Sequence, residues 1–213
     1  ILYNPPLIDP VQGIRRGVVQ ESKKIASIFL KKGVKTIVFA KSRVRSEIIA
    51  SYLRKVFANP FTEDSHIRIE TYRGGYLPGE RREIERGLRN GNIHGVVSTN
   101  ALELGIDIGG LDAAVLAGYP GSIASSWQQA GRAGRRNTVS AAVIIASNAV
   151  LDQFVVENPE YFLGTNPESA WIDPDNPFIL ADHLKCAAFE LPIKKDDPLA
   201  VLAPDILEFL EES

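Results

Sequence analysis

Residues Thr36–Ala40 read TIVFA, and this apolar run is followed at once by the polar stretch Lys41–Arg43. A continuous apolar run of this length that ends in a polar turn is typical of a strand covered on both faces. Apolar residues at helical spacing precede the run over 18–30 and follow it over 48–56. We therefore expect a strand between two helices, the repeating unit of a parallel sheet.

The same alternation continues along the chain. Further strand candidates are 67–72, 94–98, 113–117 and 141–146, and further helix candidates are 78–91 and the stretch around 128–136. Parallel strands need helical crossovers, and crossovers of one hand place helices over the sheet. The pattern predicts an α/β fold with a doubly wound, mostly parallel sheet and helices on both faces.

The character of the chain changes after about residue 150. Four prolines interrupt an acidic stretch, and two short helical patterns follow at 181–190 and 204–212. We predict three parts: a connector over 1–17, the α/β domain over 18–150, and an acidic linker with the start of a mainly helical domain over 151–213.

Charge is distributed unevenly over the 213 residues, although the net charge is only -2. Residues 1–150 hold 21 Lys and Arg against 12 Asp and Glu, whereas residues 151–213 hold 3 against 14. A basic body with an acidic tail is the asymmetry expected of a protein whose body binds a polyanion.

Composition excludes several classes of protein. A single cysteine, Cys186, excludes a disulfide framework or a multi-cysteine zinc site in this chain, and we expect its thiol to be buried among apolar neighbours. No apolar run approaches the roughly 20 residues that a bilayer requires, so we expect no membrane partner. No leader opens the chain, so we expect a cytoplasmic location. Because the chain lacks methionine and begins with Ile1, we expect a piece of a longer polypeptide.

Ligands of doubly wound sheets bind beyond the carboxyl ends of the strands, and three loops there carry chemistry. The first, Lys41–Arg43 with Arg45, combines cations with a helix start that could hold a phosphate, or is a solvated helix start. The second runs from Ser98 to Asp107 through Gly105, and offers small polar groups to a phosphate. Its aspartate could accept from a ribose hydroxyl, or be a turn residue.

The third loop includes Gly131, Arg132, Gly134 and Arg135. On a helix the two arginines project from one face. Each glycine weakens a helix by about 1 kcal/mol, so we interpret the pair as a face that another body approaches closely. Two guanidinium groups on such a face suit the charge of a transferred phosphoryl group, and the alternative is an arginine-rich surface helix.

The sequence contains no GxxxxGK[ST] phosphate loop and no acidic pair after a strand. We therefore expect these arginines to complete a site whose other half lies elsewhere.

Four ordered segments, TIVFAKSR, YRGGYLPGERR, VVSTNALELGID and QQAGRAGR, together resemble the second RecA-like lobe of superfamily 2 helicases over residues 36–136. In more detail, ALELGIDIGGLDAAVLAGYPG with WQQAGRAGRR is similar to the bacterial mitomycin-repair DNA helicase family and its fungal relatives near the RecQ group. The later segment NPFILADHLKCAAFELPI resembles the same family. Gln129 departs from the Gln-Arg opening of the last motif in other branches.

The resemblance implies a RecA-like C-terminal motor lobe of an ATP-dependent DNA helicase that moves 3′ to 5′ and serves DNA repair. It implies ATP with Mg²⁺ held mainly by an N-terminal RecA-like lobe of the same chain, and zinc only in a downstream module. Its DNA would be a single strand or a duplex with a 3′ tail. The fragment alone would be inactive, and no metal site is expected in it.

Roles follow by position in the motifs. The catalytic set would be the fingers Arg132 and Arg135, with Gln128 near the γ-phosphate. Gly105 and Asp107 would face the nucleotide. The strand phosphates would be contacted by Ser42, Arg43, Arg73, Gly74, Ser98 and Thr99.

Two other functions remain open from the residues: an RNA helicase lobe of the same superfamily, and a non-catalytic α/β nucleic-acid-binding module. Trp127 could stack on a base or anchor its helix.

Overall fold

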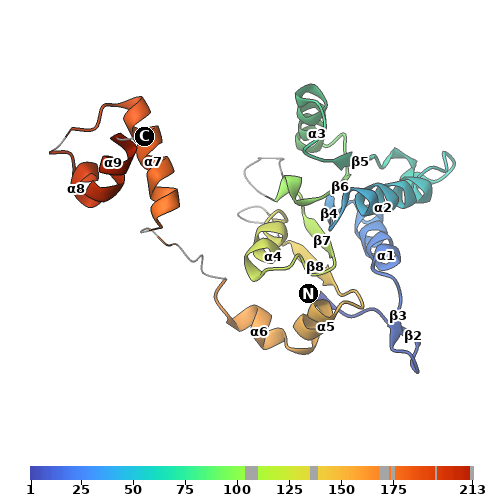
Figure 1. The fold of residues 1–213 in the computed structure, drawn as a ribbon. Coiled ribbons are helices and arrows are strands. Elements are labelled where there is room, and N and C mark those ends of the chain that lie inside the picture. Colours follow the sequence, from blue (N-terminus) through green and yellow to red (C-terminus); the bar gives the residue numbers. More distant parts are fainter. Residues whose placement is uncertain (104–109, 135–138, 168–172, 174–175, 195, 212–213) are drawn as a thin grey trace. The chain divides into compact units, whose positions relative to one another are not determined.

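The computed structural model describes residues 1–103, 110–134, 139–167, 173, 176–194 and 196–211. The chain divides into two units, Ile1–Glu168 and Ser169–Ser213. In the first unit six strands form one sheet in the order β1-β8-β7-β4-β6-β5, and all neighbouring strands are parallel (Figure 1). The strands are β1 (Leu2–Tyr3), β4 (Thr36–Ala40), β5 (Ile69–Tyr72), β6 (Gly95–Ser98), β7 (Ala113–Ala117) and β8 (Ala141–Ile145).

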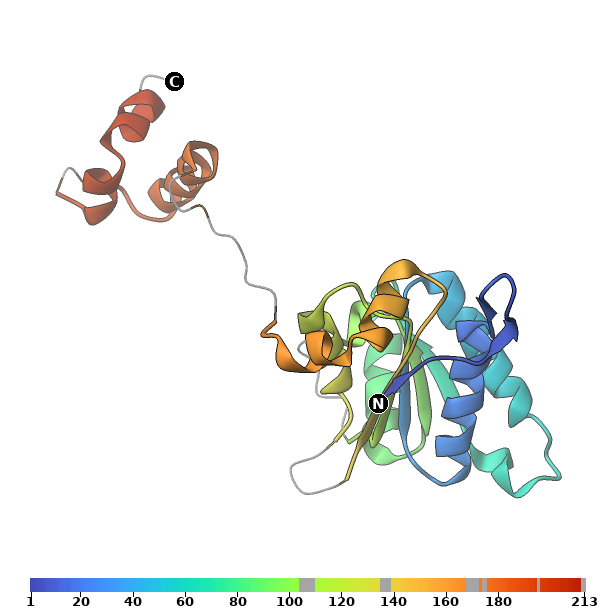
Figure 2. The same cartoon turned by 90° about the horizontal axis from the view of Figure 1, so that it is seen from below.

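Both faces of this sheet are covered, as its continuous apolar strands require. In β4, Val38 and Ala40 point into one apolar cluster and Ile37 and Phe39 into the other, because successive side chains of a strand alternate. The first cluster is completed by α1 (Val18–Lys31) and α2 (Arg43–Val56). The second is completed by α3 (Pro78–Asn90), α4 (Ile123–Ala130), α5 (Val150–Glu157) and α6 (Pro159–Gly164). Figure 2 shows helices on the two sides of the sheet, so the predicted doubly wound fold is confirmed.

Local signals explain where the helices begin and end. The Ser42 hydroxyl accepts from the backbone N–H of Arg45 at 3.2 Å and caps α2. Helix α3 begins at Pro78 and ends at Asn90, and its C-cap Gly91 has a φ of 79°, in the left-handed region. Two short 3-10 turns, η1 (Glu63–His66) and η2 (Asn100–Leu102), complete the connections.

The first residues of the chain join the sheet. Strand β1 pairs in parallel with β8, and an antiparallel hairpin follows, β2 (Leu7–Asp9) with β3 (Ile14–Arg15). The Tyr3 hydroxyl donates to buried Glu21 at 2.8 Å, and Arg16 donates to the same carboxylate at 3.0 Å. Burial by itself raises the pKa of Glu21, but these two hydrogen bonds together with the positive charges of Lys24 and Arg16 outweigh it, and the pKa is lowered. The segment expected to be a connector thus contributes an edge strand. With only two residues, this strand has no pattern of alternating side chains that the sequence could show.

The second unit is helical, with α7 (Pro177–Glu190), α8 (Pro198–Leu202) and α9 (Pro204–Glu211), as predicted for the C-terminal extension. Helices α5 and α6 also lie beyond residue 149, but they pack against the sheet of the first unit. The expectation of a buried thiol was wrong: Cys186 is exposed, because α7 buries Leu184 and Cys186 lies on another side of the helix. Among the helices described, none has the length and apolar character to cross a bilayer.

Candidate nucleic-acid interface

Three loops meet at the carboxyl edge of the sheet. Strands β4, β6 and β5 are neighbours and parallel, so the residues that follow them lie side by side. They enclose a pocket of about 500 Å³. Its lining is Lys41, Ser42, Arg43, Gly74, Thr99, Asn100 and Ala101. The structure therefore brings together four of the residues expected to contact strand phosphates: Ser42, Arg43, Gly74 and Thr99.

The electrostatics of this pocket favour an anion. Lys41 and Arg43 supply two cations to its lining, which contains no carboxylate. Helix α2 begins here without an acidic residue in its first turn, although the positive end of a helix dipole is usually paired with one. Cations at the amino end of a helix are unfavourable by themselves, and an incoming phosphate would relieve that repulsion while accepting from helix N–H groups.

Two other expected phosphate contacts lie elsewhere. Ser98 is 0% exposed, and its hydroxyl donates to the carbonyl of Tyr72 at 3.0 Å, so it bridges β5 and β6 instead of reaching the pocket. That expectation is corrected: Ser98 is the last residue of β6, a strand that is buried along its whole length, and its hydroxyl is used between two strands. Arg73 lies beside the pocket but outside its lining: its guanidinium is 3.5 Å from Glu47 and stacks 4.7 Å from the Tyr76 ring centroid.

A second pocket of about 430 Å³ adjoins the first, because Lys41, Thr99 and Asn100 line both. Its remaining wall comes from the ends of β4 and β7, from η2 and from α4. Buried Gln129 donates to Glu103 at 2.9 Å and to the Ser125 hydroxyl at 3.3 Å within this wall.

Gln128, which we predicted to lie near the γ-phosphate, is exposed. Its neighbour Gln129 lines the second pocket instead. The helical spacing of the sequence could have indicated Gln129. The buried face of α4 consists of residues three positions apart, Ile123, Ser126 and Gln129.

The expected helix around 128–136 was wrong in its bounds. Helix α4 ends at Ala130, and Arg132 follows it in a turn. Ala133 then forms a parallel bridge with Leu111, and Gly134 has a φ of 107°. A Cβ on Gly134 would lie 2.7 Å from the Ser140 hydroxyl. The positive φ and the close Ser140 contact together explain a glycine at this position by the local path of the backbone.

Arg132 is half-buried just past the end of α4. Arg135, Gly105 and Asp107, which were expected to meet the nucleotide, lie outside the described residues.

Asp152 is a residue of this edge that the sequence did not indicate. It is 1% exposed, and one carboxylate oxygen accepts from the Lys41 ammonium at 3.2 Å. The other oxygen accepts from the backbone N–H groups of Ser147 at 2.8 Å and Tyr119 at 3.2 Å. The carboxylate thus joins the ends of β4, β7 and β8. The sequence did not indicate this role, because Asp152 lies in the acidic stretch after residue 150, where carboxylates are expected to face solvent.

Trp127 anchors its helix, as the second of its two interpretations held. Its indole stacks on Phe162 with ring centroids 5.6 Å apart and an interplanar angle of 16°. This contact holds α6 against α4, although the tryptophan is still 46% exposed.

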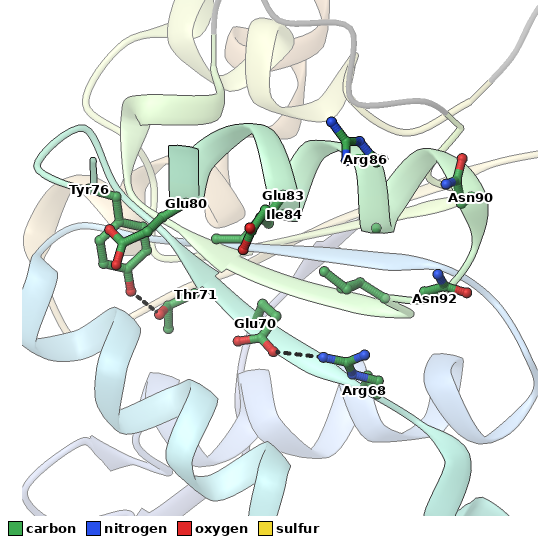
Figure 3. Close-up of a pocket in the computed structure, with 12 residues that line it drawn as sticks. Arg68, Glu70, Thr71, Tyr76, Glu80, Glu83, Ile84, Arg86, Asn90 and Asn92 are labelled. Atoms are coloured by element: carbon green, nitrogen blue, oxygen red, sulfur yellow. Dashed lines mark hydrogen bonds and ion pairs between the residues drawn. The ribbon is translucent and has the colours of Figure 1, made fainter. Parts of the chain in front are cut away.

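A third pocket, of about 490 Å³, lies between α3 and β5 (Figure 3). Glu70, Glu80 and Glu83 line it together with Arg68 and Arg86, so it carries both signs of charge. Arg68 pairs with Glu70 at 3.8 Å across its floor. In the strand-end pocket, the one lined by Lys41, Ser42, Arg43, Gly74, Thr99, Asn100 and Ala101, both charged residues are cations, and this lining suits an anion better. Within the described part of the chain no group of three or more metal-binding side chains occurs.

Comparison with known proteins finds similar sequences and structures. The helicase conserved C-terminal domain family matches residues 20–137, and the winged helix domain of the ATP-dependent helicase HRQ1 matches residues 172–212. The chain is 54% identical to the uncharacterized ATP-dependent helicase YprA of Bacillus subtilis over 213 residues, which is 100% of this chain and 28% of YprA. It is 42% identical to the ATP-dependent helicase HRQ1 of Saccharomyces cerevisiae over 197 residues, 91% of this chain and 18% of HRQ1.

Among solved structures, the DUF1998 helicase MrfA bound to DNA superposes with a TM-score of 0.88 at 54% identity, covering 99% of this chain and 28% of MrfA. MrfA bound to DNA and AMPPNP gives a TM-score of 0.87 at 53% identity, covering 100% of this chain and 29% of that one. The chain spans less than a third of the length of the curated relatives described here.

Proposed function

Because this chain belongs to the helicase conserved C-terminal domain family, we propose that it is the C-terminal motor lobe of an ATP-dependent DNA helicase that moves 3′ to 5′. The observation that carries the proposal is the cation-lined pocket at the ends of β4, β5 and β6. That the similar helicase MrfA binds DNA supports DNA as the polyanion. A role in DNA repair and a cytoplasmic location remain proposals that follow from the resemblance.

The pocket would hold the backbone of a single strand or of the 3′ tail of a duplex. Ser42 and Thr99 offer hydroxyl groups, Lys41 and Arg43 offer cations, and Gly74 lets the strand approach the backbone closely. Because all of these groups suit phosphate oxygens, the proposal assigns them to the strand backbone, and binding should then depend strongly on salt and little on sequence.

The nucleotide would lie next to the residues that follow α4. ATP with its Mg²⁺ supplies the phosphoryl group, and we assign most of its binding to an N-terminal RecA-like lobe of the intact helicase, since this sequence has no phosphate loop. The Arg132 guanidinium and the side-chain NH₂ group of Gln128 can both donate to an anion, which fits a γ-phosphate, and Arg132 lies two residues past the end of α4. Arg135, Gly105 and Asp107 complete the proposed set, and a zinc module would lie downstream of this chain.

Salt-dependent binding of fluorescent single-stranded DNA to this chain tests the strand contact. We expect Arg43→Ala to weaken binding and to lower the slope of log K against log salt by about 0.7, the value of one released counterion. Lys32→Ala is the matched control, because Lys32 is an exposed cation just after α1, at the opposite edge of the sheet. Equal effects of the two substitutions would refute the pocket as the strand site.

Hydrolysis by the intact helicase tests the nucleotide contact. We expect Arg132→Ala to lower ATP turnover by about 10³–10⁵-fold, as for other arginine fingers, while nucleotide-free strand binding is retained. Unchanged turnover would favour a non-catalytic binding module. Faster unwinding of RNA than of DNA duplexes would favour an RNA helicase.

A further inference from the structure

Lys41 lies where the strand-end pocket meets the second pocket. It lines both of them, and its side chain is 38% exposed. An ammonium group has three N–H donors, and within the described chain one of them is used, in the hydrogen bond to Asp152. Two donors therefore remain for a ligand that enters either pocket.

Asp152 holds the ammonium group of Lys41 in place. Its carboxylate is held by the backbone N–H groups of Tyr119 and Ser147, which belong to the ends of the two neighbouring strands β7 and β8. A buried charge is costly unless hydrogen bonds compensate it, and here two backbone donors and one ammonium provide that compensation. Lys41 is thus tied to the rigid sheet edge, whereas a lysine side chain is otherwise highly flexible.

Gly118 leaves room for the lysine stem. Its φ is 99°, and a Cβ at this position would lie 2.9 Å from Cε of Lys41 and 3.2 Å from Oδ2 of Asp152. A side chain at this position would therefore push against both members of the ion pair, and the glycine lets the pair keep its present geometry.

We propose that Asp152 is a positioning residue, which holds the Lys41 ammonium at the junction so that a backbone phosphate of the bound strand takes its free donors. The inference rests on the proposed function. Holding a flexible cation in its bound orientation lowers the entropy that binding would otherwise cost. Charge alone predicts the opposite effect, since a carboxylate 3.2 Å from the cation repels an incoming anion.

The two effects differ in sign, and Asp152→Asn separates them in the full chain with fluorescent single-stranded DNA. Positioning predicts that the substitution weakens binding about 3- to 10-fold, although it makes the protein more positive. It also predicts a salt slope lowered by about 0.7, as for Lys41→Gln. The double variant should lose no more than either single variant. Tighter binding, or binding unchanged from the wild type, would overturn the proposal.

Further variants keep the outcome unambiguous. If Asp152→Asn does not fold, as judged by circular dichroism and thermal unfolding, Gly118→Ala displaces the lysine stem without removing the carboxylate. Wild-type affinity in Gly118→Ala would then overturn the proposal. Arg43→Ala reports on the strand site itself: if it weakens binding while Asp152→Asn does not, positioning fails and the proposed function stands. If neither Arg43→Ala nor Lys41→Gln affects binding, the strand site itself is refuted.

Discussion

Gly118→Ala is the most informative single substitution at the sheet edge. Two costs add at this position. A non-glycine residue at a φ of 99° costs about 1–3 kcal/mol in backbone strain. In addition, the new methyl group would lie 2.9 Å from Cε of Lys41, well inside the optimal carbon–carbon separation of about 3.5–4.0 Å.

The lysine would have to move, because its stem is flexible and the backbone of Gly118 is not. Its hydrogen bond to buried Asp152 would then be lost, at a further cost of about 1–2 kcal/mol for a half-exposed partner. We therefore expect Gly118→Ala to lower the free energy of unfolding by about 2–5 kcal/mol and to weaken strand binding.

Gly121→Ala is the matched control. Gly121 has a φ of 114°, but nothing lies within 4 Å of the Cβ that the substitution adds. It should therefore cost only the strain of about 1–3 kcal/mol and leave strand binding unchanged. Urea denaturation followed by Trp127 fluorescence, together with anisotropy of labelled DNA, measures both quantities. Equal losses of stability and equal affinities for the two variants would refute the reasoning.

Two further predictions concern single side chains. Ser42→Ala and Ser122→Ala each remove a helix cap and should each cost about 1 kcal/mol in chemical denaturation, but only Ser42→Ala should also weaken DNA binding, since only Ser42 lines the strand-end pocket. Burial, with a hydrogen bond to Glu85, raises the pKa of Tyr72 to about 12. Between pH 10 and 12 the unfolded phenol has lost its proton and the folded one has kept it, so stability should fall as pH rises through this window. The fall should reach up to about 3 kcal/mol relative to Tyr72→Phe, and parallel pH curves for the two proteins would contradict it.

The amino-acid sequence by itself determined the elements and their layering. The apolar run Thr36–Ala40 is covered on both faces because every one of its side chains is apolar or small enough to be buried, whichever way it points. Helix bounds followed from local chemistry in the same way, as at Pro78 and Gly91 of α3. These features are local, so a short window of sequence contains their physical cause.

The sequence also indicated most of the strand-end pocket, because parallel strands place their carboxyl ends at one edge. It did not indicate which polar side chains at that edge are available. Ser98 and Thr99 are adjacent, but Ser98 is the last residue of the buried strand β6, whereas Thr99 lies just past the strand end and lines the pocket.

Only the tertiary structure decided the remaining features, since each depends on residues far apart in the chain. Arg132 lies in a turn because Ala133 bridges to Leu111, which no helical spacing reveals. Asp152 reaches Lys41 across 111 positions, because the strand order β8-β7-β4 brings the ends of these three strands side by side. Asp152 therefore holds Lys41 and the neighbouring strand ends only because the fold brings these residues close together.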